Sequence, residues 1–164
     1  MTLAVHQTKK ENIESILKNG LTKSKYEGSD SPYDKKSGVF LFPFDSIDSL
    51  IQGLESIREE SREHVRNSMY VIAEVDDNSS LGDCNLEGDY HRYCDKITTL
   101  HDYIKNKKRN QYEEPEIFIE KDIKPENIMG VYNIFQLLEL YDKCNSQEKC
   151  IRENITKNKW QLEK

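Results

Sequence analysis

Two places in this sequence hold residues whose types and spacing could carry chemistry. His6 lies in the apolar segment Leu-Ala-Val-His-Gln-Thr, where a buried imidazole must find a hydrogen-bond partner. Glu114 and Glu116 precede the apolar run Ile-Phe-Ile, and Pro115 between them favours an extended backbone. Side chains two residues apart on a strand point to the same face. Two carboxylates there could stabilise a developing cation or take a proton from a nucleophile.

Each feature also has a plain structural explanation. His6 could be a structural histidine whose hydrogen bonds are all made within the fold, and the carboxylates could mark a solvated strand end. Two further segments offer other chemistry. Residues 91–93 (His-Arg-Tyr) have the types that a small ribonuclease needs as acid, base and phosphate ligand. Residues 105–109 (Lys-Asn-Lys-Lys-Arg), with Tyr112 nearby, could grip phosphates and stack a base, or form a solvated basic turn.

The cysteines lack the close spacing of a zinc site, and we expect no metal. We expect them to be reduced thiols, as is usual in the cytosol. They are Cys84, Cys94, Cys144 and Cys150.

The elements that must position these residues alternate between strands and helices. Apolar runs bounded by turn residues predict strands, and apolar side chains spaced i, i+3, i+4 predict helices. We expect strands over 3–8, 38–43, 69–75, 116–121 and 128–134. We expect helices before residue 20, over 47–57 with a charged, solvated tail over 58–66, over 96–106 and 135–144, and at the C-terminus, with irregular segments over 22–37 and 81–95. The very short turn between the last two strands favours an α+β fold with a partly antiparallel sheet.

Local signals mark the helix ends. Thr8 and Glu11 form a capping-box pattern before the first helix. Gly20 suits the left-handed position after that helix, and the apolar residue that follows it would pack back on the last turn. Asp45 or Ser46 can cap the next helix.

Length and charge limit the class of protein. The 164 residues fit one domain, with a core over about 1–144 and a charged helix over 145–164. The net charge of -6, from 24 basic and 30 acidic residues, disfavours non-specific coating of nucleic acid. No apolar run approaches the ~18–20 residues of a membrane span, and the first residues do not form a signal peptide. We therefore expect a cytoplasmic protein without membrane contact.

The order of these segments resembles the ADP-ribosyltransferase superfamily, in the branch of poly(ADP-ribose) polymerases and diphtheria toxin whose site combines His, an aromatic residue and Glu. The matching segments are 5–8 (Val-His-Gln-Thr), 13–21, 38–42 (Gly-Val-Phe-Leu-Phe) with the following helix, and 114–123. The resemblance implies a split, mixed, mostly antiparallel sheet with flanking helices and a helical C-terminus. A cleft in that sheet would bind NAD as co-substrate.

The resemblance also implies roles on the NAD side. His6 would hydrogen-bond the nicotinamide-side ribose, the backbone of Gln7 would hold the carboxamide, and Thr8 would support the strand. Phe40, after Gly38, would line the nicotinamide pocket. The family's stacking Tyr has no counterpart in the helix after the second strand, where Leu50 and Ile51 stand, so Tyr26 or Tyr33 would replace it.

Glu116 would bind the 2′-hydroxyl of the same ribose of NAD and stabilise the oxocarbenium-like transition state. Glu114 would activate the acceptor, and Lys107, Arg109 and Tyr112 would bind it.

The expected function is transfer of ADP-ribose to a nucleic acid or protein with release of nicotinamide, as in toxins and effectors, which an inhibitor or antitoxin can accompany. The alternatives are an NAD glycohydrolase, a ribonuclease-type toxin, or a non-catalytic binding module. An RNA 2′-phosphotransferase ranks lower, because few arginines precede the last two strands.

Overall fold

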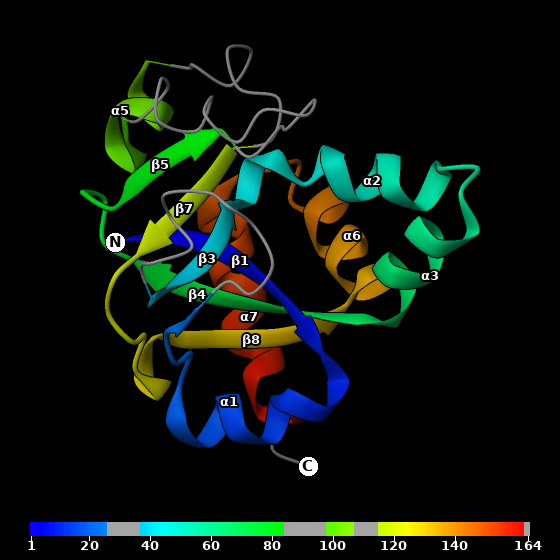
Figure 1. The fold of residues 1–164 in the computed structure, drawn as a ribbon, viewed down its shortest axis with the longest axis horizontal. Helices are drawn as coiled ribbons and strands as arrows, with labels where there is room; N and C mark the ends of the chain where they lie inside the picture. The colour runs from blue at the N-terminus through cyan, green and yellow to red at the C-terminus, as the bar shows by residue number, and fades with distance from the viewer. Residues whose placement is uncertain (26–36, 84–97, 107–114, 163–164) are drawn as a thin grey trace.

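The computed structural model describes residues 1–25, 37–83, 98–106 and 115–162 (Figure 1). Several residues singled out above lie outside these ranges. They are Tyr26, Tyr33, Cys84, His91, Arg92, Tyr93, Cys94, Lys107, Arg109, Tyr112 and Glu114.

The described strands form one eight-stranded sheet with the order β6-β5-β7-β3-β1-β4-β8, and β2 pairs with β3 beside this path. They are β1 (Thr2–Lys9), β2 (Ser24–Lys25), β3 (Ser37–Pro43), β4 (Ser68–Val75), β5 (Ser80–Asp83), β6 (Thr98–Thr99), β7 (Pro115–Ile119) and β8 (Ile128–Asn133). Every pairing among the described residues is antiparallel. β7 and β8, although joined by a short turn, lie apart with β3, β1 and β4 between them.

Helices flank this sheet, which confirms the predicted α+β class. They are α1 (Ile13–Asn19), α2 (Asp48–Glu55), α3 (Glu59–Asn67), α5 (Leu100–Lys105), α6 (Ile134–Lys143) and α7 (Glu148–Leu162). Short 3-10 turns cover Lys10–Asn12, Phe44–Ser46 and Pro125–Asn127. Figure 1 shows α2 and α3 as a hairpin at one side with α6 next to them, while α7 lies behind the sheet.

The core consists of two apolar clusters, and β1 contributes to both because its side chains alternate between the two faces. Val5 packs with Ile72 and the buried residues of α6 and α7. Ala4 packs in the other cluster, with Val71 and Ile117. Each large side chain that is fully buried stabilises the fold by roughly 1.5–3 kcal/mol. Position along β1 therefore decides which face each functional side chain meets.

The charged helix expected at the C-terminus is α7, and it supplies part of the first cluster. Ile151 and Ile155 are 1% and 0% exposed. Arg152 forms ion pairs with Glu148 and with Glu74 of β4, and it also donates to the carbonyl of Met1 at 3.0 Å. α7 is thus held to β4 and to the start of β1 by charge as well as by apolar contact.

Three local predictions at element ends are wrong. Thr8 does not cap α1, because β1 stays paired with β4 as far as Lys9 and Thr8 is held extended. Neither Asp45 nor Ser46 caps α2, which begins at Asp48, and the Ser46 hydroxyl instead donates to the Pro43 carbonyl at 2.8 Å.

The third error concerns residues 80–106. Residues 81–83, at the start of the segment predicted to be irregular, form β5 together with Ser80 and gain backbone partners on β6 and β7. The helix predicted over 96–106 covers Leu100–Lys105 in the described residues, because Thr98 and Thr99 pair with β5 and Thr99 then caps the helix. Gly20 does end α1 with a positive φ of 81°, but its ψ of -170° lies outside the left-handed helical region that was predicted.

The prediction of four reduced cysteines is wrong for one pair. Cys144, at the end of α6, and Cys150, in the first turn of α7, form a disulfide with their Cα atoms 5.3 Å apart. The sequence pattern did not indicate this bond, because six-residue spacing is common and the approach depends on the turn between the two helices. That turn places Asn145 and Ser146 in left-handed backbone conformations, with φ of 47° and 61°.

Candidate active site

A cleft opens where β1 and β3 separate. Among the described residues, these strands pair through Ala4 with Pro43 and Val5 with Phe42, while β1 continues beyond this point paired with β4 alone. The space between the strands is a cleft of about 290 Å³, closed on one side by α1. We call it the split-sheet cleft. Its lining residues are His6, Thr8, Asn12, Ser15, Ile16, Gly20, Leu21, Thr22, Gly38, Val39 and Phe40.

His6 bridges the two strands at the point of separation. Its Nδ1 lies 2.7 Å from the Phe40 carbonyl oxygen. Since a carbonyl can only accept, Nδ1 carries the proton and donates, which leaves Nε2 of the neutral ring as an acceptor. Burial lowers the pKa of His6, and the hydrogen bond to Phe40 opposes this effect. The site therefore holds a neutral imidazole of one tautomer, suited to receive a hydrogen bond from a hydroxyl group.

This arrangement predicts a pH effect on stability. Folded His6 resists protonation, whereas the unfolded chain takes up a proton near pH 6.5. The stabilisation is therefore complete above that pH, and the free energy of unfolding should fall as the pH drops below it. We expect His6→Gln to remove this part of the pH dependence. Urea unfolding at about pH 7.5 and about pH 5.5 measures it. The same substitution at exposed His64 is the control, and an equal effect there would contradict the assignment.

Phe40 takes part in the cleft through its backbone and its side chain. Its ring packs on Phe118 of β7 with centroids 4.9 Å apart. Gly38 makes this packing possible, because a Cβ at Gly38 would lie 2.0 Å from the Phe118 ring. The Gly-x-aromatic pattern thus has a steric reason here, and it fixes the wall of the cleft that carries the hydrogen bond to His6.

The helix wall of the cleft was missed by sequence analysis. Asn12, in the 3-10 turn just before α1, donates through Nδ2 to the Thr8 hydroxyl of β1 at 3.1 Å. Ser15 lies one turn further along the same wall. The polar pair Thr8 and Asn12, four residues apart, was an available signal, whereas the capping-box pattern pairs Thr8 with Glu11 instead.

The predicted acidic residue lies outside the cleft lining. Glu116 is half-buried on β7, opposite Gly82 of β5. By strand alternation Glu116 shares a face with Phe118, whose ring contacts Phe40. The structure thus brings His6, Thr8, Gly38 and Phe40 together, and it places Glu116 on the strand next to Phe40 rather than among them.

Gln7 points away from the cleft, into a second and more open groove. Its amide donates to the Ser68 hydroxyl at 3.0 Å. This groove, of about 740 Å³, shares Thr8 and Asn12 with the cleft. Its remaining lining residues are Lys9, Glu11, Glu60, Glu63, His64 and Asn67. Three carboxylates against one lysine give the groove an acidic character.

Comparison with protein-family models, with curated proteins and with solved structures found no match to this chain. Within the ranges that the structure describes, no group of three or more His, Cys, Asp or Glu side chains could hold a metal ion. In the same ranges, no helix is long and apolar enough to cross a membrane.

Proposed function

We propose that this protein is an ADP-ribosyltransferase that uses NAD and releases nicotinamide. One observation carries the proposal: a neutral His6, fixed in one tautomer by the Phe40 carbonyl, lines a cleft at the split of an antiparallel sheet. Nε2 would accept a hydrogen bond from a hydroxyl of the nicotinamide-side ribose. The volume of about 290 Å³ lies near the lower end of small-molecule sites, so the cleft suits one half of a dinucleotide rather than the whole.

The reaction needs a carboxylate close to the ribose. The bond between the anomeric carbon and the nicotinamide nitrogen breaks, and its electron pair leaves with neutral nicotinamide. The anomeric carbon gains positive charge, and an acceptor oxygen or nitrogen then attacks it and loses a proton. Glu116 is the described carboxylate that we assign to this charge, because its strand adjoins Phe40. Fixed charge aimed at a developing charge is often the largest single contribution to catalysis.

The acidic groove beside the cleft bears on the acceptor. A nucleic acid laid along Glu11, Glu60 and Glu63 would bring phosphates against carboxylates, which costs free energy at close range. A protein segment carrying Lys or Arg would meet complementary charge. The described part of the chain therefore favours a protein acceptor, and the basic segment that would favour nucleic acid lies outside it.

Nicotinamide release tests this function directly. Purified protein is incubated with NAD, either alone or together with total RNA, DNA or cell lysate. The lysate is used both intact and after protease treatment. Release that requires intact lysate protein supports transfer to a protein. Release without an acceptor would indicate a glycohydrolase. RNA cleavage without NAD would indicate a ribonuclease. Absence of both NAD binding and NAD turnover would overturn the proposal in favour of a binding module.

A further inference from the structure

The Cys144–Cys150 disulfide joins the residue that follows α6 to the first turn of α7. The two cysteines differ in exposure: Cys144 is 3% exposed, while Cys150 is only partly buried. An external thiolate can therefore reach the sulfur of Cys150 more easily than that of Cys144. The disulfide closes a short loop of the chain, so breaking it affects the junction of α6 and α7 first.

The surroundings of the sulfur atoms favour exchange. The Asn154 side-chain amide donates to the Cys150 carbonyl at 2.8 Å and lies 3.5 Å from the Cys150 sulfur. It also lies 3.7 Å from the Cys144 sulfur. A nearby N–H donor stabilises a thiolate, and so does the first turn of a helix, where Cys150 stands. Both thiolates formed by reduction would thus have a donor within reach.

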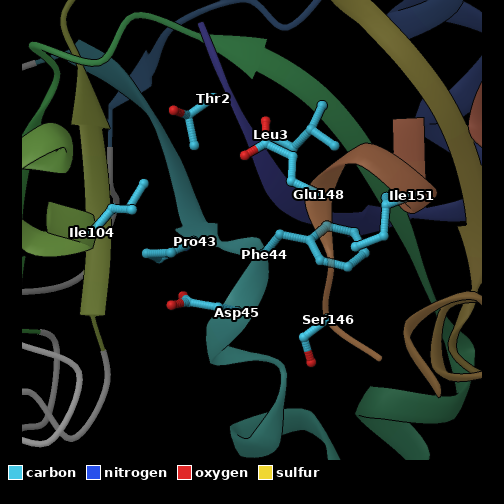
Figure 2. A pocket seen from close by; sticks show the side chains of 9 residues that line it. All are labelled: Thr2, Leu3, Pro43, Phe44, Asp45, Ile104, Ser146, Glu148 and Ile151. Atoms are coloured by element: carbon cyan, nitrogen blue, oxygen red, sulfur yellow. The ribbon is translucent and has the colours of Figure 1, made fainter. Parts of the chain in front are cut away.

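The segment closed by the disulfide forms one wall of a pocket of about 190 Å³ (Figure 2). Ser146 and Glu148 lie in this segment, and Ile151 follows it. They face Leu3 of β1 and Phe44 of the 3-10 turn after β3, and Figure 2 shows the Phe44 ring next to Ile151. Displacement of the start of α7 would therefore open apolar surface between the helix and the sheet.

We propose that the Cys144–Cys150 disulfide is a redox-sensitive clamp, which holds the start of α7 against the sheet and releases it on exchange with a low-molecular-weight thiol. The thiolate of the reagent attacks the Cys150 sulfur, and Cys144 leaves as a thiolate that takes up a proton. A second thiolate attacks the reagent sulfur of the mixed disulfide, and Cys150 leaves. Two thiols of the reagent become one disulfide, while the protein gains two thiols. Reoxidation by the reagent's disulfide reverses both steps.

Release of the start of α7 should be a local change. A closed loop of this length reduces the entropy of the opened state enough to disfavour local opening by roughly tenfold to fiftyfold. In the reduced protein, Ile151, Ile155 and the ion pairs of Arg152 still hold α7, so the helix remains docked but opens more often. The central strand β4 has partners on both sides and should not respond.

Amide hydrogen exchange in glutathione buffers of defined redox ratio tests the clamp on the full chain. Residues 148–155 should exchange roughly tenfold to fiftyfold faster in the reduced protein, while residues 70–73 of β4 stay unchanged. Alkylation of the peptide that carries Cys144 and Cys150 measures the state of this pair separately from the other cysteines. The expected result is that faster exchange and free thiols appear at the same redox ratio.

The double variant Cys144→Ser, Cys150→Ser is the matched control, and it should exchange like the reduced protein in every buffer. Equal exchange of residues 148–155 in oxidised and reduced protein would overturn the proposal. Faster exchange of β4 to the same degree would also overturn it, because it would show global loosening. Failure of the pair to oxidise with glutathione disulfide would overturn it as well. None of these measurements depends on NAD, so the clamp and the proposed function fail or succeed independently.

Discussion

Glu116→Gln is expected to lower the rate of nicotinamide release by roughly 100- to 1,000-fold, the usual loss when one fixed electrostatic contact to a transition state is removed. The amide keeps the size of the side chain and removes its charge, so the positive charge at the anomeric carbon loses its counter-charge. NAD binding should change little, because the ground state carries much less charge at that carbon. The rate at saturating NAD, compared with the dissociation constant of NAD, measures the effect.

The control for this experiment is Glu139→Gln on the exposed side of α6. It removes one charge from the molecule without touching the candidate site, and it should leave the rate unchanged. Both variants should keep the wild-type free energy of unfolding in urea within about 0.5 kcal/mol, because neither side chain is fully buried. A Glu116→Gln protein with the wild-type rate would remove this residue from the mechanism.

Sequence patterns predicted the longer elements of this fold because local chemistry determines them. β1, β3, β4, β7 and β8 are apolar runs bounded by turn residues, and each forms within a few residues of its predicted range. β5 was missed because Ser80–Asp83 contain a single apolar residue, Leu81. That strand forms because β7 supplies its backbone partners, which is a relation between segments distant in the sequence.

The candidate site likewise contains residues that the sequence indicates and residues that only the folded arrangement brings together. His6, Gly38 and Phe40 could be selected from the sequence because each interrupts or follows an apolar strand in a recognisable way. Asn12 and Ser15 could not, because their role depends on how α1 lies against the diverging strands. The position of Glu116 beside the cleft rather than in it likewise depends on strand order. Alternation along β7 predicts only which neighbours on that strand share its face.

The disulfide was missed for a related reason. Spacing alone argued for isolated thiols, and the turn that brings Cys144 and Cys150 together contains two left-handed residues that are not glycine. Left-handed backbone is common at Asn but carries only a weak sequence signal at Ser, so two such residues in succession are hard to predict. The apolar contacts of Ile151 hold the turn in place, and those contacts belong to the assembled core.

The split-sheet cleft depends on one further residue, and Gly20→Ala is expected to destabilise the protein by about 3 kcal/mol. Gly20 ends α1 with φ of 81° and ψ of -170°, a region that is essentially restricted to glycine and that costs other residues about 1–3 kcal/mol. A Cβ would also lie 2.0 Å from the backbone carbonyl oxygen of Ile123. That carbonyl accepts from the Leu21 amide at 2.9 Å, so it cannot move away without breaking a backbone hydrogen bond.

The damage should reach the cleft, because Gly20 and Leu21 both line it and α1 forms its wall. We expect weaker NAD binding at temperatures where the variant is still folded, in addition to a lower free energy of unfolding in urea. Lys18→Ala, on the exposed side of the same helix turn, should change neither quantity by more than about 0.5 kcal/mol. Unchanged stability of Gly20→Ala would mean that the bridge between Leu21 and Ile123 does not hold α1 in place. Lost stability with unchanged NAD affinity would mean that α1 is a structural wall and that the ligand lies against β1 and β3 alone.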